Sequence, residues 1–254
     1  MDKKDLLFYE AYEAFYAMAK KSKAFQNFCT DAFGEDFSQD GFSNVEQIDM
    51  ILQYIPKIDN VHILDIGCGN GKMLGYLQEK TNAYIHGFDY SEQAIKTAKL
   101  LFPKNSEFRE GIIGEINYPK EVFDVIISMD TMYFAKDMTA FVKQVKNWLK
   151  KSGVFFVGYQ EGEITPKTEN ADTTLLSRAL VANGLKYKAI DITKNTYELL
   201  KTKRVSAKAH QKEFEEEGYT DWFDMLIGQT ECATETFEQF KEKMARYIYV
   251  IQKN

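Results

Sequence analysis

Residues 61–71 read VHILDIGCGNG, a short apolar run that passes directly into a loop with glycine at every second position. An apolar pattern at helical spacing follows over residues 73–77, so the segment predicts a strand, a loop and a helix. Gly67, Gly69 and Gly71 can adopt positive backbone dihedral angles, and they place no side chain between the main chain and a bound molecule. We therefore expect a nucleotide-like ligand to lie against this loop.

The alternation of strand and helix continues along the chain. This order predicts an α/β fold with a parallel sheet covered on both faces, because each right-handed crossover must run back over the sheet. Further strands are predicted at AYIHGF (83–88), 107–109, FDVIIS (123–128), VFFVGY (154–159), KYKAIDI (186–192) and RYIYVI (246–251), and helices at 91–101, 137–149 and about 172–183.

Additional helices are predicted on either side of this core. Residues 1–55 carry apolar side chains at helical spacing and form a predicted N-terminal helical cap, in which Ser43 and Glu46 resemble a capping box. Residues 56–254 are predicted to form one α/β domain with a helical insertion at about 194–242, before the last strand. A plain surface helix is the alternative for the polar part of that insertion.

Two carboxylates accompany the glycine loop. Asp89 ends the second predicted strand at the spacing of about 20 residues expected for a carboxylate that accepts both ribose hydroxyls. Asp65 stands two positions before the first glycine, where it would repel a pyrophosphate but can hold the ammonium group of a cationic amino-acid cofactor. Dinucleotide-binding loops read GxGxxG, whereas this loop reads GxGxG. The charges and the spacing favour S-adenosylmethionine over NAD.

The segments LDIGCGNG (64–71) and HGFDYSEQAIKTA (86–98) resemble the first two motifs of the class I S-adenosylmethionine-dependent methyltransferases. The resemblance covers about residues 38–159 and, more loosely, the terminal strand. It implies a Rossmann-like, doubly wound, mostly parallel seven-stranded sheet with an antiparallel terminal strand. It also implies S-adenosylmethionine as the cofactor.

Carried over by position, the resemblance assigns the cofactor to the loop and to the ends of the neighbouring strands. Many relatives carry an aspartate after the third strand that reaches the adenine, but Ile112 stands at that place here, so backbone and apolar contacts are expected instead. The segment 37–43 resembles a motif that folds over the cofactor, although Asp40-Gly41 can equally be a simple turn. The predicted cofactor-binding residues are Asp65, Gly67, Cys68, Gly69, Gly71, Asp89, Tyr90, Ile112, Ile113, Ser128 and Gln39, with Phe42 beside them.

The methyl acceptor is expected beyond the carboxyl ends of the strands. The loop SMDTMYF (128–134) resembles an SxDxxYF stretch that lines the active site in a group of small-molecule methyltransferases. Asp130 would accept a proton or steer a cationic amine, and Tyr133 would line the sulfonium; a capping aspartate and core aromatic rings are the alternative. The predicted catalytic residues are Asp130 and Tyr133, and the predicted substrate-binding residues are Tyr133, Phe134, Tyr159 and Gln160.

Composition limits the classes of function. The 254 residues are 44% hydrophobic and suit one sizeable domain. The net charge of −6 disfavours a nucleic-acid partner, and no (N/D)PP(Y/F) motif follows the fourth strand. No apolar run approaches the roughly 20 residues of a membrane span, and no signal peptide is recognisable, so we expect a cytoplasmic protein without a membrane partner. His62, His86 and His210 lack the spacing of a metal site, so no metal is expected.

The resulting hypothesis is direct transfer of a methyl group to an N, O or C nucleophile of a small molecule, by a monomer or a homodimer. A nucleotide-dependent oxidoreductase on a Rossmann-type sheet is one alternative, which a comparison of NAD and S-adenosylmethionine binding would separate. A non-catalytic S-adenosylmethionine-binding module is the other, and it predicts binding without turnover.

Overall fold

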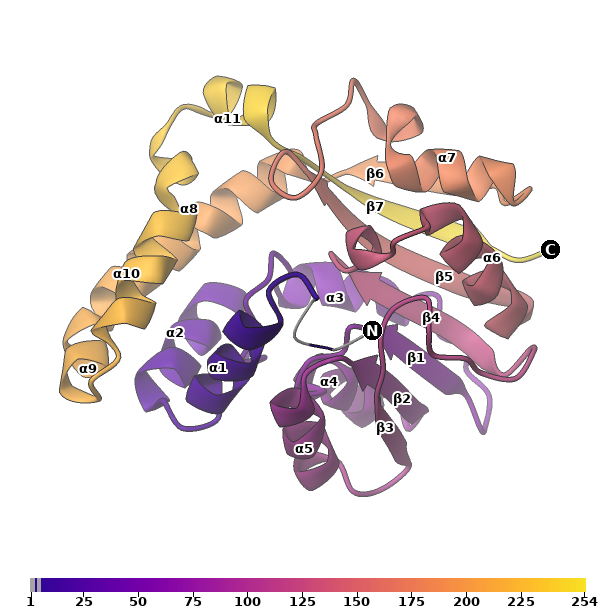
Figure 1. Ribbon diagram of the computed structural model, residues 1–254, viewed down its shortest axis with the longest axis horizontal. Coiled ribbons are helices and arrows are strands. Elements are labelled where there is room, and N and C mark those ends of the chain that lie inside the picture. Colours follow the sequence, from indigo (N-terminus) through magenta and orange to yellow (C-terminus); the bar gives the residue numbers. More distant parts are fainter. Residues whose placement is uncertain (1–2, 4–5) are drawn as a thin grey trace.

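The computed structural model describes Lys3 and residues 6–254; residues 1–2 and 4–5 of the predicted cap lie outside the described residues. Its centre is a seven-stranded sheet in the order β3-β2-β1-β4-β5-β7-β6 (Figure 1). Strand β7 runs antiparallel to both of its neighbours, and the other strands are parallel to one another. The predicted mostly parallel sheet with an antiparallel terminal strand is confirmed. The strands are β1 (His62–Ile66), β2 (Tyr84–Asp89), β3 (Ser106–Glu110), β4 (Phe123–Met129), β5 (Leu149–Glu161), β6 (Tyr187–Asp191) and β7 (Ala245–Gln252).

Helices cover both faces of the sheet, because successive strand residues point to opposite sides. Ile63 of β1 joins the apolar cluster that includes α3, α4 and α5, whereas Leu64 joins the cluster of α6 and α7. Ile63 and Leu64 are both fully buried, and burial on both faces of the sheet explains why the strands read as continuous apolar runs. The helices named here are α3 (Val45–Leu52), α4 (Lys72–Thr81), α5 (Glu92–Leu101), α6 (Met138–Trp148) and α7 (Leu175–Ala182).

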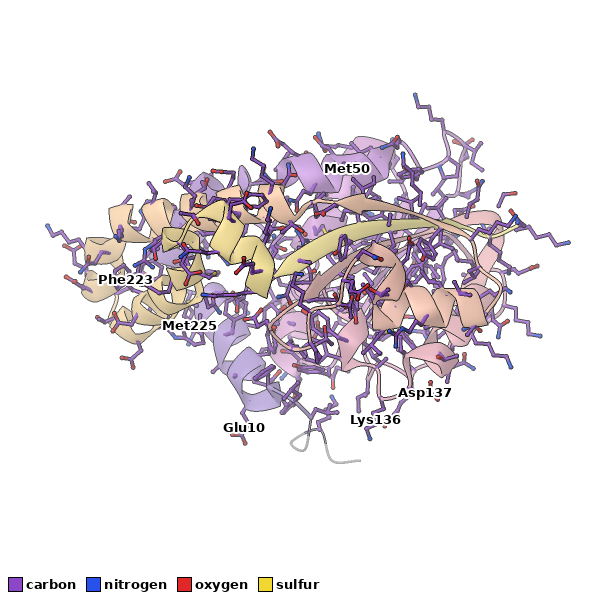
Figure 2. The ribbon with its side chains drawn as sticks, turned by 90° about the horizontal axis from the view of Figure 1, so that it is seen from above. Glu10, Met50, Lys136, Asp137, Phe223 and Met225 are labelled. Atoms are coloured by element: carbon purple, nitrogen blue, oxygen red, sulfur yellow. The ribbon has the colours of Figure 1, made fainter. Side chains whose placement is uncertain are left out.

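The remaining helices form a second layer at the end of the sheet where the cavity lies. The helices α8 (Thr193–Ala209), α9 (Gln211–Glu216), α10 (Thr220–Gln229) and α11 (Phe237–Lys243) connect β6 to β7, and the N-terminal helices α1 (Tyr9–Ala19) and α2 (Lys23–Phe33) pack beside them (Figure 1). Seen from above, Phe223 and Met225 of α10 lie toward the opposite end of the molecule from Lys136 and Asp137 (Figure 2). None of the helices in the described part of the chain combines the length and apolarity needed to cross a membrane.

A carboxylate from the inserted helices holds the start of α2. Glu217 accepts hydrogen bonds from the backbone N–H groups of Lys23 at 2.9 Å and Ala24 at 3.0 Å, and from the Ser22 hydroxyl at 2.6 Å. These N–H groups have no partner inside the helix, and the negative charge complements the helix dipole. The contact ties the segment between β6 and β7 to the N-terminal helices.

The predicted capping box before α3 is wrong. Asn44, not Ser43, is the N-cap residue, and its side chain accepts from the N–H group of Gln47 at 3.1 Å. The Ser43 hydroxyl instead accepts a hydrogen bond from the guanidinium of Arg246 at 2.8 Å. A distant partner therefore takes the side chain that local sequence assigned to the helix.

Candidate functional site

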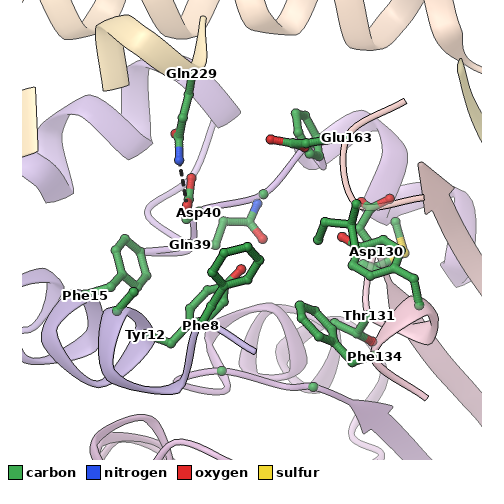
Figure 3. Close-up of a pocket in the computed structure, with 18 of the residues that line it drawn as sticks. Phe8, Tyr12, Phe15, Gln39, Asp40, Asp130, Thr131, Phe134, Glu163 and Gln229 are labelled. Atoms are coloured by element: carbon green, nitrogen blue, oxygen red, sulfur yellow. Dashed lines mark hydrogen bonds between the residues drawn. The ribbon is translucent and has the colours of Figure 1, made fainter. Parts of the chain in front are cut away.

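A cavity of about 940 Å³ lies beyond the carboxyl ends of the parallel strands (Figure 3). Its walls come from α1, residues 37–42, the glycine loop, the loop after β4, and the inserted helices α8, α10 and α11. This volume is at the upper end of the roughly 300–1,000 Å³ typical of small-molecule pockets. The cavity is large enough for a nucleoside cofactor and a second small molecule.

The glycine loop forms the floor of the cavity. Gly67 has φ +73° and Gly69 has φ +53°, and both line the cavity. A Cβ atom on Gly67 would lie 2.6 Å from Cγ2 of Thr131, and one on Gly69 would clash with the Tyr16 hydroxyl. Absence of side chains is therefore a steric requirement at both positions.

Gly71 has a different role from the one predicted. It has φ +77° at the N-cap of α4 and is not among the residues that line the cavity. A Cβ atom there would lie 2.9 Å from the ring of Phe108, behind the loop. Gly71 therefore permits close packing of helix on sheet and does not face the cavity.

Asp65 is a buried carboxylate that lacks a full set of partners. Its side chain lines the cavity and is 2% exposed, and its Oδ1 atom has no hydrogen-bond partner among the described residues. Burial, followed by the charge of Asp89, raises its pKa well above the usual value. A buried carboxylate without a partner is unfavourable. A cationic group of a ligand would supply the missing partner.

Asp89 and Tyr90, which the sequence predicts to bind the cofactor, line the adjoining part of the cavity. The Asp89 carboxylate accepts from the N–H groups of Gly69 at 3.0 Å and Ser91 at 2.8 Å, and burial raises its pKa to about 6. Each carboxylate oxygen keeps a further lone pair for a ligand hydroxyl. The Tyr90 hydroxyl donates to the carbonyl of Leu7 at 3.2 Å, so its ring presents a fixed apolar surface.

The loop after β3 contributes Gly111 and Ile113 to the cavity, but not Ile112. Ile112 faces a separate hollow of about 380 Å³ between this loop and α6. The Gly111 N–H group donates to the carbonyl of Asp89 at 2.9 Å, which brings the loop alongside β2. Of the two isoleucines predicted to touch the cofactor, the structure places one at the cavity wall.

Cys68 lines the cavity, whereas Ser128 does not. Ser128 is fully buried, and its hydroxyl is hydrogen-bonded at 2.7 Å to the Thr131 hydroxyl, which donates to the carbonyl of Ile66. Thr131, which the sequence did not single out, takes the place at the wall. The predicted contact of Ser128 with the cofactor is thus replaced by a link between the β4 loop and β1.

Asp130 lies at the cavity wall with φ +56°, but its carboxylate is not free. Arg246 donates from Nε to both oxygens at 3.1 Å and from Nη2 to Oδ2 at 2.7 Å. The side chains of Arg246 and Asp130 are 0% and 8% exposed. This pairing conflicts with the prediction that Asp130 accepts a proton or steers an amine, because its charge is already neutralised.

Arg246 also connects Asp130 to residues before α3. It donates to the carbonyl of Phe42 at 2.5 Å, to Oε1 of Gln47 at 2.8 Å and to the Ser43 hydroxyl. One buried guanidinium therefore joins β7, the loop after β4 and the segment that covers the cavity.

Tyr159 and Gln160 do not line the cavity, contrary to the prediction. Both are fully buried within β5. Residues 159–161 are expected to end the fifth strand, and β5 does end at Glu161. The chain reaches the cavity only in the turn beyond the strand, where Glu163 and Ile164 line it.

The segment 37–42 lines the cavity from above. Gln39 is at the wall, but its amide donates to the carbonyl of Ser43 at 2.6 Å, inside its own loop. Asp40 accepts from Nε2 of Gln229 at 2.9 Å and lies 3.9 Å from Nζ of Lys203. The aspartate that looked like part of a turn is therefore a further acidic group of the site, besides Asp65, Asp89 and Asp130.

Aromatic side chains close much of the remaining wall, among them Tyr133 and Phe134, which the sequence predicts to bind the substrate. Burial raises the pKa of Tyr133 well above its usual value, so its hydroxyl stays protonated. Tyr12, Tyr16 and Trp222 also line the cavity.

The sequence reading missed Thr131, Glu163, Lys203 and Arg246. The position of Lys203 indicates burial, because helical spacing places it on the same face of α8 as the buried Thr196 and Leu199. Its side chain is 2% exposed. Arg246 is a charged residue in an otherwise apolar strand, which is also unusual.

Comparison with known proteins identifies related chains. A family model described as a methyltransferase domain matches residues 57–218. The ubiquinone biosynthesis O-methyltransferase of Pelagibacter ubique is 32% identical over 102 residues, which cover 39% of this chain and 42% of that protein. Phosphoethanolamine N-methyltransferase 1 of Arabidopsis thaliana is 29% identical over 136 residues, or 51% of this chain and 28% of that protein. The chain thus spans less than half the length of both relatives.

Among solved structures, phosphoethanolamine N-methyltransferase 2 of Haemonchus contortus is similar in fold. That structure contains phosphomonomethylethanolamine and S-adenosylhomocysteine. The TM-score is 0.78 at 15% identity, over 99% of this chain and 61% of that one. The likeness shows a common fold.

Proposed function

The chain belongs to the methyltransferase-domain family, and from that premise we propose that it is an S-adenosylmethionine-dependent methyltransferase acting on an N, O or C nucleophile of a small molecule. The observation that carries the proposal is the unpartnered Oδ1 atom of buried Asp65 beside a loop in which Gly67 and Gly69 have no room for a side chain. An ammonium group is a suitable partner for this carboxylate, whereas a pyrophosphate would be repelled. The related O- and N-methyltransferases are consistent with a small acceptor.

The residues present fit the cofactor. Asp65 and the loop of Gly67 and Gly69 would hold its amino-acid part, Asp89 would accept the ribose hydroxyls, and Tyr90 would adjoin the adenine. S-adenosylmethionine supplies a methyl group already activated on a sulfonium, so the protein needs no separate leaving-group chemistry.

The chain's own contribution is then to orient the acceptor and exclude water. Tyr12, Tyr16 and Trp222 line the side of the cavity away from the sheet. Asp130, held by Arg246, and the neighbouring Tyr133 form a fixed wall of the acceptor space. Both remain proposed site residues, with Asp130 as a positioning group and Tyr133 in contact with the reacting molecules.

Two alternatives make different predictions. An oxidoreductase would bind NAD through the same loop, where the Asp65 carboxylate would repel the pyrophosphate. A non-catalytic module would bind S-adenosylmethionine without turnover. We also propose a cytoplasmic location, consistent with three unpaired cysteines, a monomeric or homodimeric state, and no nucleic-acid or membrane partner.

Calorimetry with S-adenosylmethionine, S-adenosylhomocysteine and NAD tests the proposal. We expect both S-adenosyl compounds to bind and NAD not to bind. Asp65→Asn and Asp89→Asn should weaken binding at least about tenfold, or 1.4 kcal/mol, whereas Asp59→Asn, on an exposed loop away from the cavity, should not. Binding of NAD in preference to the S-adenosyl compounds would refute the assignment. Methyl transfer to a panel of acceptors then separates an enzyme from a binding module.

A further inference from the structure

The part of the cavity beyond the glycine loop has a distinct charge pattern. We call this part the acceptor half; it is lined by Tyr12, Asp40, Phe42, Asp130, Tyr133, Glu163, Lys203, Trp222 and Gln229. Glu163 and Asp40 both face it, from separate loops (Figure 3). The partners of each charged group decide what kind of molecule the acceptor half can receive.

Two of its carboxylates are already compensated. Asp130 is paired with buried Arg246, with an Nη2–Oδ2 distance of 2.7 Å. Asp40 lies 3.9 Å from Nζ of Lys203 and accepts from the amide of Gln229.

Glu163 is the exception. Its carboxylate makes no hydrogen bond or ion pair with any of the residues that the structure describes, although its side chain lines the cavity. The side chain is exposed to solvent at the cavity wall; its partial burial raises its pKa, Asp40 and Asp130 act in the same direction, and Lys203 opposes them. Among the described residues, Glu163 is thus the acidic group of the acceptor half without a protein partner.

The basic residues at the wall are already engaged. Of the lining residues, Lys203 and Lys243 are the ones with a permanent positive charge. Lys203 donates to the carbonyl of Gly41 at 3.3 Å besides facing Asp40. Lys243 is bonded to both oxygens of Glu235 at 2.6 and 2.8 Å. A phosphate or carboxylate on the acceptor would have to displace these contacts.

Aromatic rings also line the acceptor half. Tyr12, Phe42 and Trp222 line the same space, and the faces of such rings attract cations. The ring of Phe42 already lies 5.5 Å from Nζ of Lys203 and 5.8 Å from the guanidinium of Arg246. A wall that combines aromatic rings with one carboxylate lacking a protein partner suits a cation that carries an apolar body.

We propose that the acceptor half receives an amine in its cationic form, with the Glu163 carboxylate as the ionic partner and aromatic side chains of the cavity around the apolar part. Because an ammonium nitrogen has no lone pair, it must lose one proton, to the Glu163 carboxylate or to water, before it can accept the methyl group. This inference rests on the proposed methyl transfer, because it names the acceptor class of the same site. It selects an amine nitrogen over a phenol or a phosphorylated acceptor. Glu163 is then a specificity-determining residue.

Matched series of small molecules test this assignment by calorimetry on the full chain. Butylamine, 2-phenylethylamine and tryptamine span a range of bulk, and each is compared with the alcohol and the carboxylate that replace its amino group. Every titration is made with and without S-adenosylhomocysteine. Glu163→Gln removes the charge while keeping the shape, and Glu79→Gln on α4, outside the cavity, is the matched control.

We expect at least one amine to bind about tenfold more tightly than its alcohol, as one ion pair with a cation–π contact would give. The preference for the amine should disappear in Glu163→Gln and remain in Glu79→Gln. Neither substitution should change the affinity for S-adenosylhomocysteine. Equal or tighter binding of the alcohols or carboxylates overturns the inference, and so does an amine preference that survives in Glu163→Gln. Failure of S-adenosylhomocysteine to bind counts instead against the proposed function, since the probe titrations without it are read separately.

Discussion

The guanidinium of Arg246 and the carboxylate of Asp130 form a buried ion pair, with Nη2 and Oδ2 2.7 Å apart, between the start of β7 and the loop after β4. The two residues are 116 positions apart in the chain. The contact neutralises an aspartate that the sequence suggested as a proton acceptor, and it fixes the wall of the acceptor half. The stability of the fold and the shape of the site therefore depend on the same pair.

Asp130→Asn should destabilise the protein strongly. Asparagine keeps the size of the side chain and tolerates the positive φ, but it leaves the buried Arg246 without its counter-ion, at a cost of about 3–5 kcal/mol. Urea unfolding measures this change, with Asp59→Asn as the control. The double variant Asp130→Asn/Arg246→Met should recover part of the loss. A single variant as stable as the wild type would show that the pair contributes little.

Gly69→Ala should weaken the binding of S-adenosylhomocysteine. The new Cβ atom would clash with the Tyr16 hydroxyl, and alanine disfavours the φ of +53°. We expect a loss of about tenfold or more, partly recovered in Gly69→Ala/Tyr16→Phe. Gly184→Ala is the control, because Gly184 has φ +67° but open space around it. Unchanged affinity in Gly69→Ala would contradict the role of the loop.

The affinity for S-adenosylhomocysteine should fall as the pH drops below about 6. Burial raises the pKa of Asp89 to about 6, and the protonated acid can no longer accept from both ribose hydroxyls as a carboxylate does. Titrations across this range should show weaker binding on the acid side. In Asp89→Asn the affinity should be lower throughout and should lose this pH dependence. A variant that retains the dependence would assign it to another group.

Acid should destabilise the fold through His86. His62 Nδ1 and His86 Nε2 are 2.9 Å apart between β1 and β2, and burial, assisted by the charge of His62, lowers the pKa of His86 from 6.5 to about 4. Between pH 6.5 and about 4 the unfolded chain therefore binds more protons at this residue than the folded chain does. The stability that neutral His86 contributes is fully present above pH 6.5 and is lost as the pH falls toward 4.

Urea unfolding of the wild type and His86→Gln over this pH range measures the effect. Asp89 has a raised pKa, so its contribution to the free energy of unfolding changes with pH in the opposite direction. The effect of His86 is therefore taken from the difference in unfolding free energy between the two proteins. The wild type should lose more stability on acidification than His86→Gln. Parallel curves would mean that His86 titrates normally.

Much of the fold and the cofactor side of the cavity could be predicted from local sequence. The strand, loop and helix of residues 61–77 follow from apolar periodicity and from glycine's access to positive φ, both of which act over a few neighbouring residues. Asp65 and Asp89 follow because the carboxyl ends of parallel strands meet at one edge of the sheet. Local patterns were also sufficient for the helices around the sheet.

The acceptor side was decided by tertiary structure. Asp130 is paired because β7 brings Arg246 beside it, and Lys203 of α8 is buried near Asp40 although it lies in a polar helical stretch. Glu163 reached the wall because β5 continues through Glu161, in register with β7. Which charges are paired depends on contacts between segments far apart in the chain, whose energies arise only after packing, so no local periodicity encodes them.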